Sequence, residues 1–276
     1  MAMHLRRVGD NEVQTPIRRY AHPGSGREIA VIGSLHAGQE AYFARLRERI
    51  DALSGARAVV HVEGSGRVDG EHIGAAPQER TVLAIMDQAA ALNRRRIVEL
   101  GWAYQVDALG YPSHWELHDL SGVEVLRRIG VPAMGRFAAR QLRAVDWPDT
   151  DTSRIERFRA RMAIGLHLAA ASKNNKVRTS SRSLVYRVMV HERTAYALES
   201  ALAADQDVVL IWGPMHLPGF AAGLAAHGFA EVGEPEWHTA LQLPSFSASL
   251  WRLAAGPLRR SRTRRASVAT ASKEPR

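Results

Sequence analysis

No cysteine occurs among the 276 residues of the chain. Disulfide frameworks and thiolate zinc sites are therefore excluded, and any metal ion has to be held by histidine, aspartate or glutamate. Long apolar runs are also missing, since no stretch approaches the roughly 18 residues that span a membrane. The first residues, MAMHLRRVGDNEVQ, lack the apolar stretch of a signal peptide. We therefore expect a cytoplasmic protein.

Acidic residues are too few to match the basic ones, and the excess lies at the C-terminus. The net charge is +9, and residues 257–276 carry seven basic residues and one acidic residue, which leaves +3 for the remainder. This segment has almost no large apolar side chain, so burial cannot offset its ordering entropy and we expect a disordered, basic tail. Weak contact of the tail with nucleic acid or an acidic surface is the alternative.

Apolar residues make up 46% of the chain, enough for one substantial core, and we expect a single α/β domain over residues 1–256. The segment IRRYAHPGSGREIAVIG predicts a β-hairpin with its second strand from Glu28 to Ile32. An amphipathic helix follows in QEAYFARLRERIDAL, and then a short strand from Ala58 to Val62. Strand, helix and strand with short loops form a βαβ unit, whose two strands are parallel.

The middle of the chain, about residues 77–204, is predicted to be largely helical. Two capping-box patterns are expected to open helices there: Ser121-x-x-Glu124 and Ser153-x-x-Glu156. Polar residues 171–183 predict an exposed loop, and the apolar run 207–212 predicts a return to the sheet. The fold class is therefore α/β, with a central mostly parallel or mixed sheet, helices on both faces and a largely helical middle insertion.

Two strand-like runs end in the same motif, Gly-x-x-His. IAVIGSLH ends with Gly33 and His36, and VVLIWGPMH ends with Gly213 and His216, while VVHVEG ends a strand between them at Glu63. Ligands gather at the carboxyl ends of parallel strands, and glycine there permits a sharp turn and a close approach. If the three strands are neighbours, the two histidines and the glutamate converge on one rim.

Two imidazoles and one carboxylate allow two kinds of chemistry. They can hold a divalent ion with an open position, for which we expect zinc, manganese or cobalt, and that ion activates water. Without a metal, one histidine is the general base, and Glu63 orients it and stabilises its imidazolium. The residues alone leave both possibilities open, beside a purely structural role.

In order and spacing, these motifs resemble those of the TraB/TIKI group, which is related to erythromycin esterases and ChaN-like haem-binding proteins. The stretches VIGSLH, VVHVEG and IWGPMHLPGF carry the resemblance over most of residues 28–235. Two further stretches fit the pattern: YPSHWELHDLSGVEVL, which contains Asp119, and MVHERTAYAL, which contains Glu192 and Arg193.

The resemblance implies an α/β fold with the motif residues in one cleft, and hydrolysis of a peptide, ester or related acyl bond. That activity is metal-dependent in the TIKI branch and metal-free in erythromycin esterases, and we expect the metal-dependent form here, with the metal-free form as the alternative. His36, Glu63 and His216 carry over as catalytic and metal-binding residues. The alternative is a module that binds a peptide, haem or another small ligand in the same cleft without turnover. TraB members act on peptide pheromones, but we expect no membrane anchor in this chain, so their peptide partners need not transfer.

Three further residues are candidates for substrate binding: Arg193, Glu192 and Asp119. A guanidinium can clamp a carboxylate or phosphate with its fork, although Arg193 can equally pair with Glu192. Asp119 can hold the second nitrogen of a histidine, but we favour a role in capping the helix that starts near Ser121.

His114 and His118 lie four residues apart with Glu116 between them. The surroundings indicate a loop, in which helical spacing has no meaning, so this pair is not expected to bind a metal. The sequence indicates neither the substrate nor the oligomeric state.

Overall fold

The structure, a computed structural model, describes residues 5–9, 11–55, 58–64, 72, 74–148, 152–171 and 183–254. The expected basic tail at 257–276 lies outside these residues, as does the expected loop at 171–183 apart from its two end residues.

Strands form one large and one small sheet. Their bounds are β1 Arg6–Val8, β2 Glu12–Ala21, β3 Glu28–Gly33, β4 Ala37–Gly38, β5 Ala58–Val62, β6 Ala103–Tyr104, β7 Glu116–Leu117, β8 Asp207–Trp212, β9 Ala230–Glu231 and β10 Glu236–Gln242. In the large sheet β3, β8, β5 and β7 lie side by side in this order and are parallel. On the other side of β3 lies β2, which is antiparallel to it and to β1, β9 and β10. The predicted hairpin and the mixed sheet with a parallel centre are confirmed.

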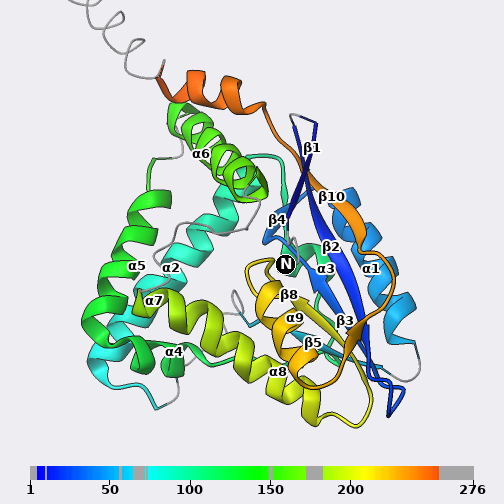
Figure 1. The fold of residues 1–276 in the computed structure, drawn as a ribbon. Coiled ribbons are helices and arrows are strands. Elements are labelled where there is room, and N and C mark those ends of the chain that lie inside the picture. The colour runs from blue at the N-terminus through cyan, green and yellow to red at the C-terminus, as the bar shows by residue number, and fades with distance from the viewer. Residues whose placement is uncertain are drawn as a thin grey trace, which may run out of the picture.

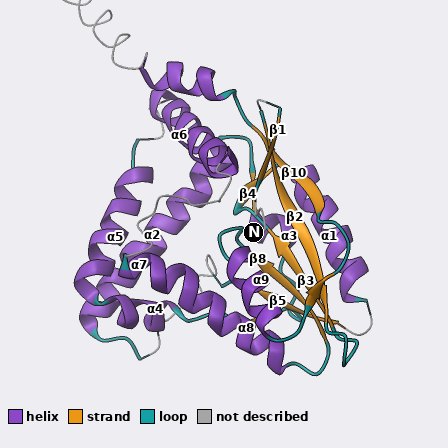
Figure 2. Ribbon diagram, in the orientation of Figure 1, coloured by secondary structure: helices purple, strands orange, loops and turns teal. Residues whose placement is uncertain are grey.

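Helices make up more than half of the described residues. Their bounds are α1 Glu40–Ser54, α2 Pro77–Glu99, α3 Gln105–Leu109, α4 Gly122–Ile129, α5 Val131–Val145, α6 Thr152–Ala171, α7 Leu184–Tyr186, the π-helical η1 Arg187–Glu192, α8 Arg193–Ala203 and α9 Leu217–Ala226. Residues 246–254 are also helical. Most helices lie between β5 and β8 in the sequence, so the helical middle is confirmed (Figure 2). None of the described helices is both long and apolar enough to cross a bilayer.

Helices pack on both faces of the parallel strands, as predicted. Alternate residues of a strand face opposite sides of a sheet, which separates two sets of buried side chains. The first set packs against α1 and α3: Ala30, Ile32, Val60, Val62, Val209 and Ile211 against Tyr42, Phe43, Leu46, Ile50 and Leu109. The second set packs against α8 and α9: Ile29, Val31, Val208, Leu210 and Trp212 against Ala197, Ala201, Leu217, Phe220 and Leu224.

The helical middle has an apolar cluster of its own. Figure 1 shows α2, α4 and α5 grouped on one side of the molecule, with α8 reaching from this group to the sheet. The cluster consists of residues from these helices together with η1: Val82, Leu83, Val125, Leu126, Ile129, Met134, Ala138 and Val188. Because η1 and α8 are continuous, one helical rod contacts both this cluster and the sheet.

Only one of the two predicted capping boxes is present. Ser121 is the N-cap of α4: its hydroxyl accepts from the amide of Glu124, whose carboxylate accepts from the amide of Ser121. The prediction for Ser153 is wrong, because α6 already includes Thr152 and the hydroxyl of Ser153 accepts from Arg157 inside the helix.

Glycines allow α9 to lie close to α8. A Cβ atom added to Gly219 would be 2.8 Å from Cγ2 of Thr194, and one added to Gly223 would be 2.1 Å from Cδ2 of Leu198. Both distances are shorter than carbon atoms can approach without a bond. The close packing of α9 on α8 therefore requires glycine, which has no side chain, at these two positions.

Gly219→Ala is expected to lower the free energy of unfolding by about 1–3 kcal/mol, because Thr194 is β-branched and cannot turn its methyl group away. Gly165 is exposed in α6, and an added Cβ would meet no neighbouring atom within 4 Å. Gly165→Ala should therefore raise the same quantity by about 0.5–1 kcal/mol through helix propensity. Urea denaturation measures both variants, and equal effects would contradict the close crossing.

Candidate active site at the strand ends

The three predicted strand ends meet at one edge of the sheet. β3, β8 and β5 are adjacent and parallel, so Gly33, Gly213 and Glu63 lie at their carboxyl ends. Hydrogen bonds continue past the strands, from the amide of Ser34 to the carbonyl of Trp212 (2.9 Å) and from the amide of Glu63 to that of Ile211 (3.1 Å). The βαβ interpretation is therefore confirmed at the place where ligands bind in such sheets.

The motif glycines have a packing role. A Cβ on Gly213 would lie 3.2 Å from Oε2 of Glu63, and the Gly213 amide donates to that same oxygen at 2.8 Å. A Cβ on Gly33 would lie 3.1 Å from Cδ2 of Leu217 and 3.2 Å from Cδ of Pro16. Both strand ends thus use glycine for a close approach rather than for a left-handed turn.

Glu63 belongs to a buried ionic network. Arg193 donates from Nη2 to Oε1 of Glu63 at 2.9 Å, and from Nε to Oδ1 of Asp119 at 2.8 Å. It also donates from Nη2 to Oδ2 of Asp119. The three side chains are 5% exposed or less, so all three charges lie away from solvent. A guanidinium suits this place because its planar fork reaches two carboxylates at once.

Glu63 stays ionised despite its burial. Burial alone raises its pKa, but the Arg193 guanidinium outweighs this, with a further contribution from the Gly213 amide, and the pKa lies well below the usual range of a glutamate. In turn, Glu63 and Asp119 outweigh the effect of burial on Arg193 and raise its pKa. The network of two carboxylates and one guanidinium carries a net charge of −1.

Asp119 is not the helix cap that the sequence favoured. Its Oδ2 accepts from the amide of Gly64 at 2.8 Å as well as from Arg193, and its Oδ1 accepts from the amide of Leu120 at 2.8 Å. The capping role falls to Ser121. Asp119 therefore ties the chain after β7 to the chain after β5.

Glu192 faces away from this network and Arg193 does not pair with it. The carboxylate of Glu192 pairs instead with two other arginines: it lies 3.6 Å from Nη1 of Arg128 and 3.4 Å from Nε of Arg187. The donors of Arg193 point to acceptors of the protein, including the carbonyl of Met189. Arg193 thus holds the carboxylate of Glu63 in place. Substrate contact by Arg193, Glu192 or Asp119 stays a prediction.

A π-helical turn comes directly before the site. Residues Arg187–Glu192 are π-helical, and the next two residues, Arg193 and Thr194, are both buried. Wide turns of this kind change the phase of the side chains that follow and occur often at functional sites. Here the turn is followed by two polar side chains that both contact residues at the strand ends.

His216 has a defined tautomer. Thr194 donates its hydroxyl hydrogen to the carbonyl of Val190, so its oxygen, 2.8 Å from Nδ1 of His216, accepts from that nitrogen. Nε2 therefore carries the lone pair, and it lies 3.7 Å from Oε1 of Glu63. Trp212 packs edge-on against the imidazole at 4.8 Å and fixes the ring plane.

Burial keeps His216 neutral. The side chain is 5% exposed. Burial lowers its pKa to about 4, because the opposing effect of Glu63 is smaller and Arg193 adds to the decrease. At neutral pH the ring is therefore unprotonated and its Nε2 can accept a proton or bind a metal ion.

His36 lies at the exposed side of the same edge. Its Nδ1 is 2.9 Å from Oε1 of Gln105, whose amide group donates to the hydroxyl of Tyr111, and the Gln105 backbone amide donates to the carbonyl of His36. His36 is close enough to Glu63 and His216 to contribute to the pKa values of both groups. Both histidines thus donate from Nδ1 to an oxygen and leave Nε2 for chemistry. The sequence did not reveal the two orienting partners, Thr194 and Gln105.

The predicted two-histidine, one-glutamate metal set is not assembled in the described positions. Within the described residues, the one group of three or more His, Asp or Glu side chains whose ligand atoms all lie within 4.8 Å is His61, Glu116 and His118. Both oxygens of Glu63 already accept from Arg193 and Gly213. Metal binding by His36, Glu63 and His216 therefore needs movement of these groups and stays a prediction.

Comparison with known proteins gives no relative: no family model, no curated protein and no solved structure matches this chain. The resemblance to the TraB/TIKI group thus stays a prediction. The chemistry of the site rests on its own geometry.

Arg193→Met is expected to lower the free energy of unfolding by about 3–5 kcal/mol, because two buried carboxylates lose their counter-charge. Arg193→Lys should also destabilise, since an ammonium cannot bridge both carboxylates. The matched control is Glu192→Gln at the neighbouring position, where only partly exposed ion pairs are lost and a change below about 1 kcal/mol is expected. Denaturant unfolding measures all three, and a loss in Arg193→Met no larger than in Glu192→Gln would contradict the network.

Stability is expected to fall as the pH decreases from 6.5 towards 4. The folded chain holds His216 neutral down to a pKa of about 4, whereas the unfolded chain binds the proton near 6.5. The contribution is complete above pH 6.5 and is lost through this window, by on the order of 3 kcal/mol. His61, whose pKa burial also lowers to about 4, adds an effect of the same sign.

Urea unfolding at pH 7 and pH 5, in the presence of a chelator, measures this dependence. His216→Gln should reduce the difference between the two pH values, because the titrating group is gone. An unchanged difference in the variant would show that His216 is not held neutral.

Proposed function

We propose that the chain is a hydrolase of an acyl bond, in a peptide, an ester or a related substrate, with His216 as its general base. One observation carries the proposal: a buried, neutral imidazole has its Nδ1 held by Thr194, and its Nε2 lies 3.7 Å from the ionised carboxylate of Glu63. A fixed tautomer beside a permanent negative charge is what general-base chemistry needs.

In the proposed reaction, Nε2 of His216 takes a proton from a water molecule, and the resulting hydroxide attacks the acyl carbon. The imidazolium that forms is stabilised by Glu63, which cannot take the proton itself because Arg193 and Gly213 hold its pKa low. The proton then passes to the leaving group as the tetrahedral intermediate collapses. Burial strengthens the attraction between imidazolium and carboxylate.

His36 is proposed as the second imidazole of the reaction. It lies on the exposed side of the edge, with Nε2 left open by the contact of Nδ1 with Gln105. From there its unprotonated Nε2 can accept a hydrogen bond from the attacking water or from an N–H or O–H group of the substrate. Arg193, Asp119 and Thr194 are positioning residues, because they act through Glu63 and His216.

The metal-free form fits the described positions better than the metal-dependent form. A zinc, manganese or cobalt ion on His36, Glu63 and His216 would need Glu63 to share oxygens that already accept from Arg193 and Gly213. The gathering of Glu63, Asp119, Arg193 and His216 in one network supports membership of the TraB/TIKI group, which stays a proposal together with its reaction class.

The test is hydrolysis of a panel of chromogenic esters and fluorogenic peptides by the purified chain with and without chelator. His216→Gln is expected to lower kcat/KM by about 10²–10⁴-fold, as is usual for loss of a general base. His227→Gln is the matched control and should leave kcat/KM unchanged. His216 lies directly before α9, and the exposed His227 lies directly after it. Activity should persist in chelator.

Other outcomes contradict specific parts of the proposal. Activity that is lost in chelator and restored by manganese or zinc would replace the metal-free form by the metal-dependent one. Full activity in His216→Gln would remove the proposed base. No hydrolysis of any panel substrate by the unsubstituted chain would contradict the hydrolase and favour binding of a peptide or haem in the same place, detected by titration with either.

A further inference from the structure

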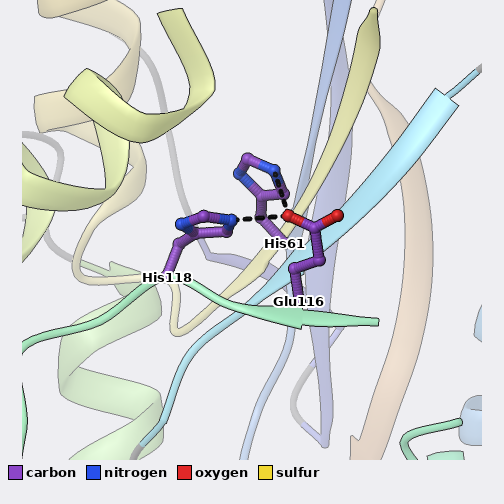
Figure 3. Close-up of side chains that lie close together, drawn as sticks. All are labelled: His61, Glu116 and His118. Atoms are coloured by element: carbon purple, nitrogen blue, oxygen red, sulfur yellow. Dashed lines mark hydrogen bonds and ion pairs between the residues drawn. The ribbon is translucent and has the colours of Figure 1, made fainter. Parts of the chain in front are cut away.

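A second group of chemically reactive side chains lies on the face of the sheet that packs against α8. His61 is in β5, Glu116 is the first residue of β7, and His118 follows that strand (Figure 3). His61 and Glu116 are register partners in the parallel pair of β5 and β7. None of the three belongs to the proposed catalytic residues, so the group is a separate site.

The distances suit a bound metal ion. Oε2 of Glu116 lies 2.8 Å from Nε2 of His118 and 3.7 Å from Nε2 of His61, and the two rings have centroids 3.9 Å apart. Bonds of about 2.0–2.1 Å at tetrahedral angles place zinc ligand atoms roughly 3.3 Å from one another. The two distances lie on either side of this value, and the ligand atoms of all three residues lie within 4.8 Å of one another.

His61 also has an unsatisfied polar group. Its imidazole is 1% exposed, Nδ1 is buried without a hydrogen-bond partner among the described residues, and Nε2 faces Glu116 at a distance too long for a hydrogen bond. A buried ring nitrogen without a hydrogen-bond partner is costly and calls for an explanation. Nε2, which faces Glu116, is therefore the nitrogen of His61 that is available to an ion.

We propose that His61, Glu116 and His118 bind a divalent transition-metal ion of the zinc type. Two imidazoles and one carboxylate are a common ligand set for zinc and leave its fourth position open. The three residues line an open surface pocket of about 480 Å³, far larger than one ion requires, which leaves room for water or a small ligand. Asp205 lines the same pocket and offers another carboxylate.

A bound ion would fasten β7 to its neighbour. β7 is a two-residue strand at the edge of the sheet, paired with β5 through His61 and Glu116 and through Val62 and Leu117. The ion adds a cross-link at this pairing. The bound ion would thus also hold β7 in register with β5.

Zinc binding is measured by calorimetry on the full, untagged chain after removal of metal, with Mg²⁺ as the ion that should not bind. The unsubstituted chain is expected to bind one equivalent of Zn²⁺ at this site. Glu116→Gln and His118→Ala should weaken that binding at least tenfold. These two positions are at least partly exposed, so the substitutions leave the core intact. His114→Ala, at an exposed histidine two residues before β7, is the matched control and should bind like the unsubstituted chain.

Amide hydrogen exchange gives a second readout. Zn²⁺ should slow exchange of residues 116–120 in the unsubstituted chain and in His114→Ala, but not in Glu116→Gln. The inference is overturned if the unsubstituted chain binds no Zn²⁺ at micromolar concentration, or if His118→Ala and Glu116→Gln bind it undiminished.

The result is independent of the proposed hydrolase. His216→Gln should retain this equivalent of Zn²⁺, whereas loss of zinc binding in that variant but not in His118→Ala would assign the ion to the strand-end site instead. Hydrolysis without zinc binding, or zinc binding without hydrolysis, separates the two proposals.

Discussion

A buried guanidinium between two carboxylates is the interaction on which the candidate site depends. Arg193 comes from α8, Glu63 follows β5 and Asp119 follows β7, so one side chain joins three segments that are distant in the sequence. Ionic groups in such a place have lost their hydration and are tolerated only when each finds its partner. The positions of α8 and the two strand ends are therefore mutually dependent.

This network also decides which side chain can act as a base. A carboxylate that accepts from Arg193 and from the Gly213 amide has little affinity for a proton, so Glu63 provides charge and not proton transfer. His216 has the opposite properties, because burial keeps it neutral and Thr194 holds its Nδ1. Two titratable groups 3.7 Å apart thus have distinct roles set by their surroundings.

The sequence was sufficient for the parts of the fold that depend on local pattern. Apolar runs that end in glycine and the helix between them predicted adjacent parallel strands, and so predicted that Glu63 and His216 would meet. The partners of these residues could not be found in this way, because Arg193 is 130 residues from Glu63 and Gln105 is 69 from His36. Only the packing of the helical middle against the sheet brings them together. The grouping of His61 with Glu116 and His118 could not be found either, because it arises only from the pairing of β5 with β7.

The alternation of side chains along β5 connects the two sites. His61 and Glu63 are two residues apart and therefore point to the same face, and on the neighbouring segment His118 is followed directly by Asp119. The strands that carry the inferred metal ligands thus continue into the two carboxylates that hold Arg193. An ion that fixes β7 against β5 also restricts where Asp119 and Glu63 can lie. Because Glu63 lies beside His216, an ion at the edge of the sheet would help to keep this carboxylate in place, although the two sites are separate.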